Sequence, residues 1–161
     1  GNMYYDLEGY EYALYWHEKV AMEGNVKAEN NLGVIHYKLK DYARSEKWLK
    51  IAADNNLSSA CFNLGLLYLN FDRVEEAMES FRKGSVLLSD DCKYNLAILY
   101  SQNGDEKSAI SMYKQLYRSG HKKGCYNMGL LMEINNDENE AEKDYLKSCK
   151  SEFVKSQYRL A

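Results

Sequence analysis

Apolar and small residues recur along the chain with a fixed spacing of 32 residues. The segments "NLGVIHY", "NLGLLY", "NLAILY" and "NMGLLME" begin at Asn31, Asn63, Asn95 and Asn127. A fixed period between about 20 and 50 residues is typical of repeat proteins, in which each unit buries its apolar face only against its neighbours. The pattern therefore predicts a stacked array of similar units.

A second series with the same period predicts a second helix in each unit. Small residues occupy positions 13, 45, 77, 109 and 141. The residue four positions after each of them has a large side chain. A third position lies three residues further on. The spacing i, i+4 and i+7 is that of residues on one face of a helix. We predict first helices at 27–39, 59–70, 90–102 and 122–134, and second helices at 10–23, 42–55, 74–87, 106–118 and 138–149.

Residues at the predicted helix ends have the chemistry of caps. Asp41, Asp105 and Asp137 directly precede second helices, where a carboxylate accepts hydrogen bonds from unpaired backbone amides. Gly24 and Gly120 follow second helices, where a left-handed residue ends the turn at low cost. We expect both features at the helix boundaries.

Two residues of the repeated motif have a predicted structural role. Gly33, Gly65, Ala97 and Gly129 carry almost no side chain, so we expect the first helix to press against the second at positions such as Ala77. The asparagine two residues earlier could be part of a ligand row. We favour a hydrogen-bond clasp that holds the turn between repeats.

The segments "AADNNLSSACFNLGLLY" (Ala52–Tyr68) and "VAMEGNVKAENNLG" (Val20–Gly33) resemble the junction between units of the Sel-one-like repeat family, a relative of the tetratricopeptide repeat. Trp16-His17 and Trp48-Leu49 are similar to the aromatic pair of its second helix. The family's glycine-rich insertion between the two helices is absent, since Gly65 and Ala77 are twelve residues apart, as in tetratricopeptide repeats.

The period and the resemblance together predict an all-α fold, a right-handed α/α superhelix of antiparallel helical hairpins. We expect one domain over 1–161, with a partial repeat at 1–24, repeats at 25–56, 57–88, 89–120 and 121–152, and a terminal helix at 153–161.

Composition excludes several classes of partner. A net charge of -3 and a pI near 5.7, with no run of lysine or arginine, argue against nucleic-acid binding. No apolar run approaches the roughly 20 residues of a membrane span. We therefore expect a cytoplasmic protein, unless an export signal preceded Gly1.

The cysteines do not complete the Cys-x7-Cys pairs that staple junctions in cysteine-rich members of the family. Cys61 and Cys125 face Ala53 and Tyr117 at the other half of the pair, Cys149 faces Gln157, and Cys92 falls at a small-residue position. Four cysteines without such partners fit reduced thiols. We expect no disulfide.

Catalytic and metal motifs are weak. Two Ser-x-x-Lys tetrads begin at Ser80 and Ser111, but the Ser-Asp-Asn and Lys-Thr-Gly motifs of β-lactamases are absent. His17, His36 and His121 are scattered, and no zinc or calcium spacing occurs. We therefore expect no enzymatic activity, cofactor or metal.

Surface recognition is the function that remains. First helices of such arrays line an inner, concave face suited to a peptide or a partner's helix. We predict a non-catalytic interaction module or adaptor for a protein or peptide. A self-associating structural solenoid, and thus a homo-oligomer, is one alternative, and a lactamase-like cell-wall enzyme is the other. The predicted binding surface comprises Lys27, Asn30, Val34, Tyr37, Phe62, Leu66, Leu69, Tyr94, Ile98, Lys123, Tyr126, Leu130 and Tyr158.

Overall fold

The computed structural model describes residues 2–121, 123, 124 and 126–128 of the chain. Over these residues the secondary structure is helical, with no strand. The helices are α1 (Asn2–Met22), α2 (Val26–Lys38), α3 (Tyr42–Asp54), α4 (Ser58–Leu69), α5 (Val74–Val86), α6 (Asp90–Gln102) and α7 (Glu106–Arg118). The all-α prediction is confirmed.

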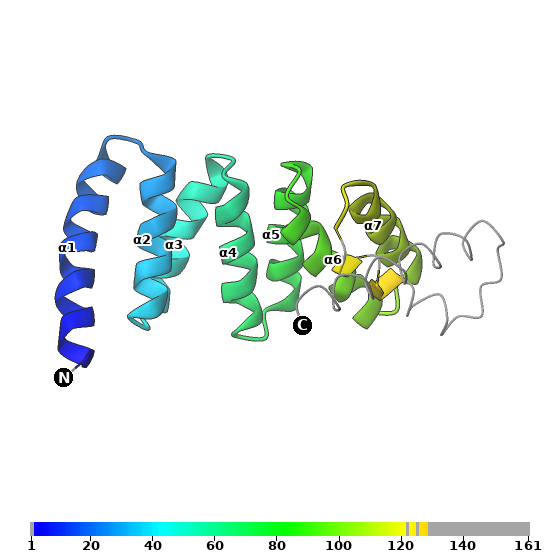
Figure 1. Ribbon diagram of the computed structural model, residues 1–161, viewed down its shortest axis with the longest axis horizontal. Coiled ribbons are helices and arrows are strands. Elements are labelled where there is room, and N and C mark those ends of the chain that lie inside the picture. Colours follow the sequence, from blue (N-terminus) through cyan, green and yellow to red (C-terminus); the bar gives the residue numbers. More distant parts are fainter. Residues whose placement is uncertain (1, 122, 125, 129–161) are drawn as a thin grey trace, which may run out of the picture. The chain divides into compact units, whose positions relative to one another are not determined.

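The chain forms two compact units, which are described separately. In unit 1 (Gly1–Ser89), α1 to α5 follow one another side by side, and α2–α3 and α4–α5 form hairpins (Figure 1). In unit 2 (Asp90–Ala161), α6 packs against α7. The predicted single domain over 1–161 stays a prediction.

The predicted helix bounds from α2 to α7 agree with the structure to within about one residue, and those of α6 and α7 coincide with it. Helix α1 is longer than predicted, because it begins at Asn2 rather than at residue 10. The predicted helices at 138–149 and 153–161, and most of 122–134, lie outside the described residues.

The repeated glycine makes room for a large side chain of the second helix. A Cβ at Gly33 would lie 2.5 Å from Cγ of Leu49, and a Cβ at Gly65 would overlap the ring of Phe81. The predicted approach at the small position also occurs, since the Ser45 hydroxyl donates to the Gly33 carbonyl at 2.7 Å. The expected contact with the small position was therefore incomplete, because the large side chains of Leu49 and Phe81 also lie against the glycines.

The cap predictions are confirmed where the structure describes them. The carboxylates of Asp41 and Asp105 accept hydrogen bonds from the backbone amides of Arg44 and Ser108, at 3.1 and 3.2 Å. Asp137 lies outside the described residues. Gly24 and Gly120 have φ of 81°, as expected of residues that end a helix.

Non-glycine residues adopt the same left-handed conformation in the other turns. Asn56 and Leu88 have φ of 60° and 63°, and they share the repeat position of Gly24 and Gly120. In the turns that follow first helices, the residue with positive φ is Lys40, Asp72 or Gly104. A left-handed residue thus recurs at the same repeat positions in these turns.

Candidate partner-binding face

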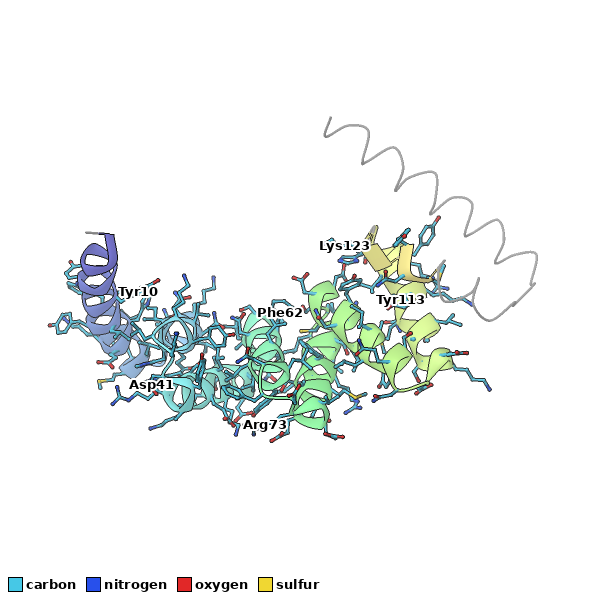
Figure 2. All side chains as sticks on the ribbon, turned by 90° about the horizontal axis from the view of Figure 1, so that it is seen from below. Tyr10, Asp41, Phe62, Arg73, Tyr113 and Lys123 are labelled. Carbon is cyan, nitrogen blue, oxygen red and sulfur yellow. The ribbon has the colours of Figure 1, made fainter. Side chains whose placement is uncertain are left out.

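The predicted surface residues of unit 1 lie on α2 and α4. Figure 2 labels Phe62 of this surface and Arg73, which lie toward opposite sides of the α4–α5 hairpin. The side chains of Lys27, Tyr37 and Leu66 are exposed, whereas Asn30, Val34, Phe62 and Leu69 are half-buried. We call this surface, formed by these seven residues, the first-helix face of unit 1.

A cavity of about 150 Å³ opens on this face, between α2 and α4. It brings together the predicted residues Val34, Tyr37 and Leu66. Three residues that were not predicted complete its lining, namely Leu49, Asn63 and Leu67. The cavity is therefore apolar with one carboxamide and carries no charged side chain.

The asparagines of the repeated motif join neighbouring first helices. The Asn63 carboxamide donates to the Asn30 side-chain oxygen at 2.9 Å, between α4 and α2. In unit 2, Asn127 donates to the Tyr94 hydroxyl at 3.2 Å, whereas Asn95 donates to the Asp91 carbonyl of its own helix. The predicted clasp on the turn between repeats was wrong, because these carboxamides reach an adjacent helix face or their own helix.

In unit 2 the predicted residues divide between packed and exposed positions. Tyr94 and Ile98 are half-buried, and Tyr94 packs against the core cluster of Ala97 and Tyr113. Its ring lies 5.2 Å from that of His121. Lys123 and Tyr126 are exposed, the latter at 40%. Leu130 and Tyr158 lie outside the described residues.

Because Tyr94 packs on the core of unit 2, we expect Tyr94→Ala to lower the free energy of unfolding by about 2 kcal/mol or more. Tyr126→Ala, at the same repeat position, is the matched control and should cost less than about 1 kcal/mol. Urea denaturation of both variants measures the difference. Equal losses would contradict the packing of Tyr94 described above.

The other side of unit 1 is a network of paired charges. Arg73 donates to both oxygens of Glu46, at 3.0 and 3.3 Å, and its guanidinium lies 4.3 Å from the centre of the Tyr68 ring. The Tyr68 hydroxyl donates to Glu46 at 3.2 Å. Burial opposes ionisation of Glu46, but hydrogen bonds from Lys50 and Arg73 hold its pKa below the ordinary value. The network ties α3 to the α4–α5 turn.

A larger pocket of about 280 Å³ lies on this side, between α3 and α5. Its lining includes Cys61 and Leu64 together with charged residues. Lys83 and Asp54 pair across it at 2.9 Å. Because its rim charges are already paired within the protein, this pocket offers less to a ligand than the uncharged cavity on the first-helix face.

Comparison with known proteins places the chain among helical repeats. Residues 58–84 and 91–119 match the tetratricopeptide repeat model. A Sel1 repeat protein from Oxalobacter formigenes is 27% identical, with a TM-score of 0.62 over 84% of this chain and 60% of that one. The chain is a repeat protein related to the tetratricopeptide and Sel1-like families. The predicted resemblance and the α/α solenoid fold class are thereby confirmed.

Other solved structures share the fold of these tetratricopeptide-like repeats. The c5321 antigen of uropathogenic Escherichia coli, which displays a Sel1-like repeat fold, has a TM-score of 0.76 at 22% identity, over 89% of this chain and 33% of that one. YrrB, a tetratricopeptide repeat protein with an unusual peptide-binding site, has a TM-score of 0.63 at 14% identity, over 98% and 87%.

Among curated proteins, response regulator aspartate phosphatase E of Bacillus subtilis is 28% identical over an alignment 138 residues long, which covers 70% of this chain. The chain spans only 36% of the length of that relative.

The Ser-x-x-Lys tetrad at Ser80 is part of the helical packing of these repeats. The Ser80 hydroxyl is buried and donates to the Glu76 carbonyl at 2.9 Å. Lys83 points instead to Asp54, with which it pairs. Serine and lysine are thus engaged with other groups rather than with each other.

Two further observations concern the part of the chain that the structure describes. It contains no group of three or more His, Cys, Asp or Glu side chains placed to hold a metal ion. Among its helices we find none with the length and apolar character of a membrane span.

The burial of one polar residue of these repeats was not predicted from the sequence. His36 is 3% exposed, and both of its ring nitrogens lack a hydrogen-bond partner. The available signal was its repeat position, which is occupied by tyrosine at 68 and 100.

Proposed function

We propose that the chain is a non-catalytic interaction module whose first-helix face binds an extended segment of a partner protein. The observation that carries this proposal is the uncharged cavity between α2 and α4, which is lined by Val34, Tyr37 and Leu66. Tetratricopeptide-like repeats in general serve protein recognition, and the structural likeness to the peptide-binding protein YrrB supports the same use here.

The size of the cavity suits one bulky apolar side chain. Apolar cavities of roughly 150 Å³ accommodate a molecule such as benzene. The cavity on the first-helix face has about this volume. Its lining of leucines and Val34 disfavours burial of a charged side chain. A leucine or phenylalanine of the partner would fill it, and its backbone would pass the carboxamides of Asn30 and Asn63.

The charges around the cavity favour an acidic partner segment. Helix α4 carries no charged residue. The carboxylate of α2, Glu29, is buried and accepts a hydrogen bond from Asn55 at 3.3 Å. Lys27 and Lys38 of α2 are exposed. Carboxylates on the partner, flanking its apolar anchor, would therefore meet lysines and no opposing acid on these two helices.

The test is selection of a displayed random peptide library on the full chain, followed by fluorescence anisotropy with a selected peptide. Leu66→Glu places a carboxylate at the cavity and should weaken binding at least tenfold, which corresponds to about 1.4 kcal/mol. Leu66 is 41% exposed, so we expect the folded structure to tolerate this change.

Val86→Glu is the matched control, because Val86 on α5 is 76% exposed and lies outside the cavity lining. It should leave the affinity unchanged. Selected peptides that bind the Leu66 variant as tightly as the native chain would contradict the proposal.

Light scattering over a range of concentrations separates the proposed interaction module from the self-associating alternative. Self-association requires a molecular mass that rises with protein concentration.

A further inference from the structure

Three charged positions around Tyr68 carry the opposite charge at the corresponding positions around His36. Both residues occupy the same position of the 32-residue repeat. Tyr68 lies near two cations, since Arg73 is 4.3 Å and Lys50 is 5.9 Å from the centre of its ring. The residues at the corresponding positions around His36 are acids, Asp41 in place of Arg73 and Glu18 in place of Lys50.

The ion pair at the start of the second helix is reversed as well. Arg73 pairs with Glu76 three residues later, whereas Asp41 pairs with Arg44 three residues later, at 3.4 Å. The reversed pair leaves a carboxylate beside the buried imidazole. Oδ2 of Asp41 lies 3.9 Å from Nδ1 of His36.

Burial favours neutral His36 and disfavours its protonated form. A protonated imidazole has two N–H donors, and neither ring nitrogen of His36 has a hydrogen-bond partner. Burying an unpaired charge costs free energy. The nearest carboxylate, that of Asp41, is held by Arg44 through Oδ2 and caps α3 through Oδ1.

We infer that His36 is a proton-sensitive joint between α1 and the α2–α3 hairpin. In mildly acidic solution, protonated His36 competes with Arg44 for the Asp41 carboxylate, and the joint loses stability. The charged groups that face His36 are Asp41 at the start of α3, Arg44 on α3 and Glu18 on α1. Helix α2 itself contributes none of them.

The direction of the pH effect follows from the balance of these groups. Burial lowers the pKa of His36, the carboxylates of Asp41 and Glu18 oppose that effect, and Arg44 reinforces it. The folded-state pKa thus lies below the ordinary value of 6.5. The stabilising contribution is complete above pH 6.5 and is lost as the pH falls through the lower folded-state pKa.

The first test is an NMR pH titration of the His36 imidazole in the full chain. We expect a midpoint below 6.5. Arg44→Gln should raise it, because the competing cation is removed from Asp41. Asp41→Asn should lower it further while keeping the helix cap, since asparagine caps as well as aspartate. A midpoint at or above 6.5 in the native chain would overturn the inference.

The second test compares melting temperatures at pH 7.5 and pH 5.5. We expect the native chain to lose more of its melting temperature between these two pH values than His36→Tyr, which restores the tyrosine found at this position in the next two repeats. If His36→Tyr shows the same acid loss as the native chain, His36 is not the sensor. The NMR titration decides the matter if that variant does not fold.

Discussion

Phe81→Ala is expected to lower the free energy of unfolding by about 3–5 kcal/mol. The Phe81 ring is fully buried, and it fills the space beside Gly65 where a Cβ would overlap it. Because Gly65 has no side chain to move into the vacated volume, the cavity left by alanine cannot close from that side. Denaturant unfolding followed by circular dichroism measures the loss.

The control for this prediction comes from the first repeat. There the glycine, Gly33, lies against Leu49, which is also fully buried. Phe81→Leu reproduces that pair at Gly65 and should therefore cost less than about 1.5 kcal/mol. Equal losses for the alanine and leucine variants would show that the side chain at position 81 does not fill this contact.

The helices of the described chain could be predicted because their signals are local and repeated. Asp105 precedes α7 and caps it, and the bounds of α6 and α7 match the predicted ranges. Helix α1 carries no comparable start signal, so its first turns were missed.

Contacts between helices were harder to predict, because the repeat fixes which residues share a face but not where a side chain points. The small residue at position 45 does touch Gly33, yet Leu49 fills the adjacent space. For the same reason, Asn63 was assigned to a turn although it bonds to Asn30 on the neighbouring helix.

The turns show a second limit of the sequence. A glycine at a helix end predicts a left-handed residue, as at Gly24 and Gly120. Asn56 and Leu88 adopt the same conformation at the same repeat position, although neither is a glycine. A leucine with positive φ is unfavourable by itself, so its side chain gives no signal of this conformation in the sequence.

The candidate site was predicted in part. The face carried by α2 and α4 followed from the helical period, and three of its residues line the cavity. Leu49 and Leu67 were not predicted, because they are core residues and the cavity exists only where their packing leaves space. His36 was named only as one of three scattered histidines, since its lack of hydrogen-bond partners depends on the folded surroundings.

Excision of residues 29–60 is expected to leave a cooperatively folding helical protein. The cut removes 32 residues, one full period, and joins Ala28 to Cys61 within a hybrid of α2 and α4. Leu64 then takes the place of Leu32 against α1, and Gly65 takes the place of Gly33. The cap of Asn25 on the amide of Ala28 is retained. A single sigmoidal melting transition, followed by circular dichroism, is the expected result.

The matched control removes residues 33–60, which keeps four more residues and breaks the period. Four helical residues advance the chain by about 6 Å and turn it by about 40°. Two contacts of the hybrid helix then lie out of register with each other. One is the contact of Ala28 and Leu32 with Ala21 on α1, and the other is the contact of Gly65 with Phe81. We expect this variant to melt at least about 10 °C below the 32-residue excision, or without cooperativity. If the two variants melted alike, the helices would not be held by contacts that follow the repeat.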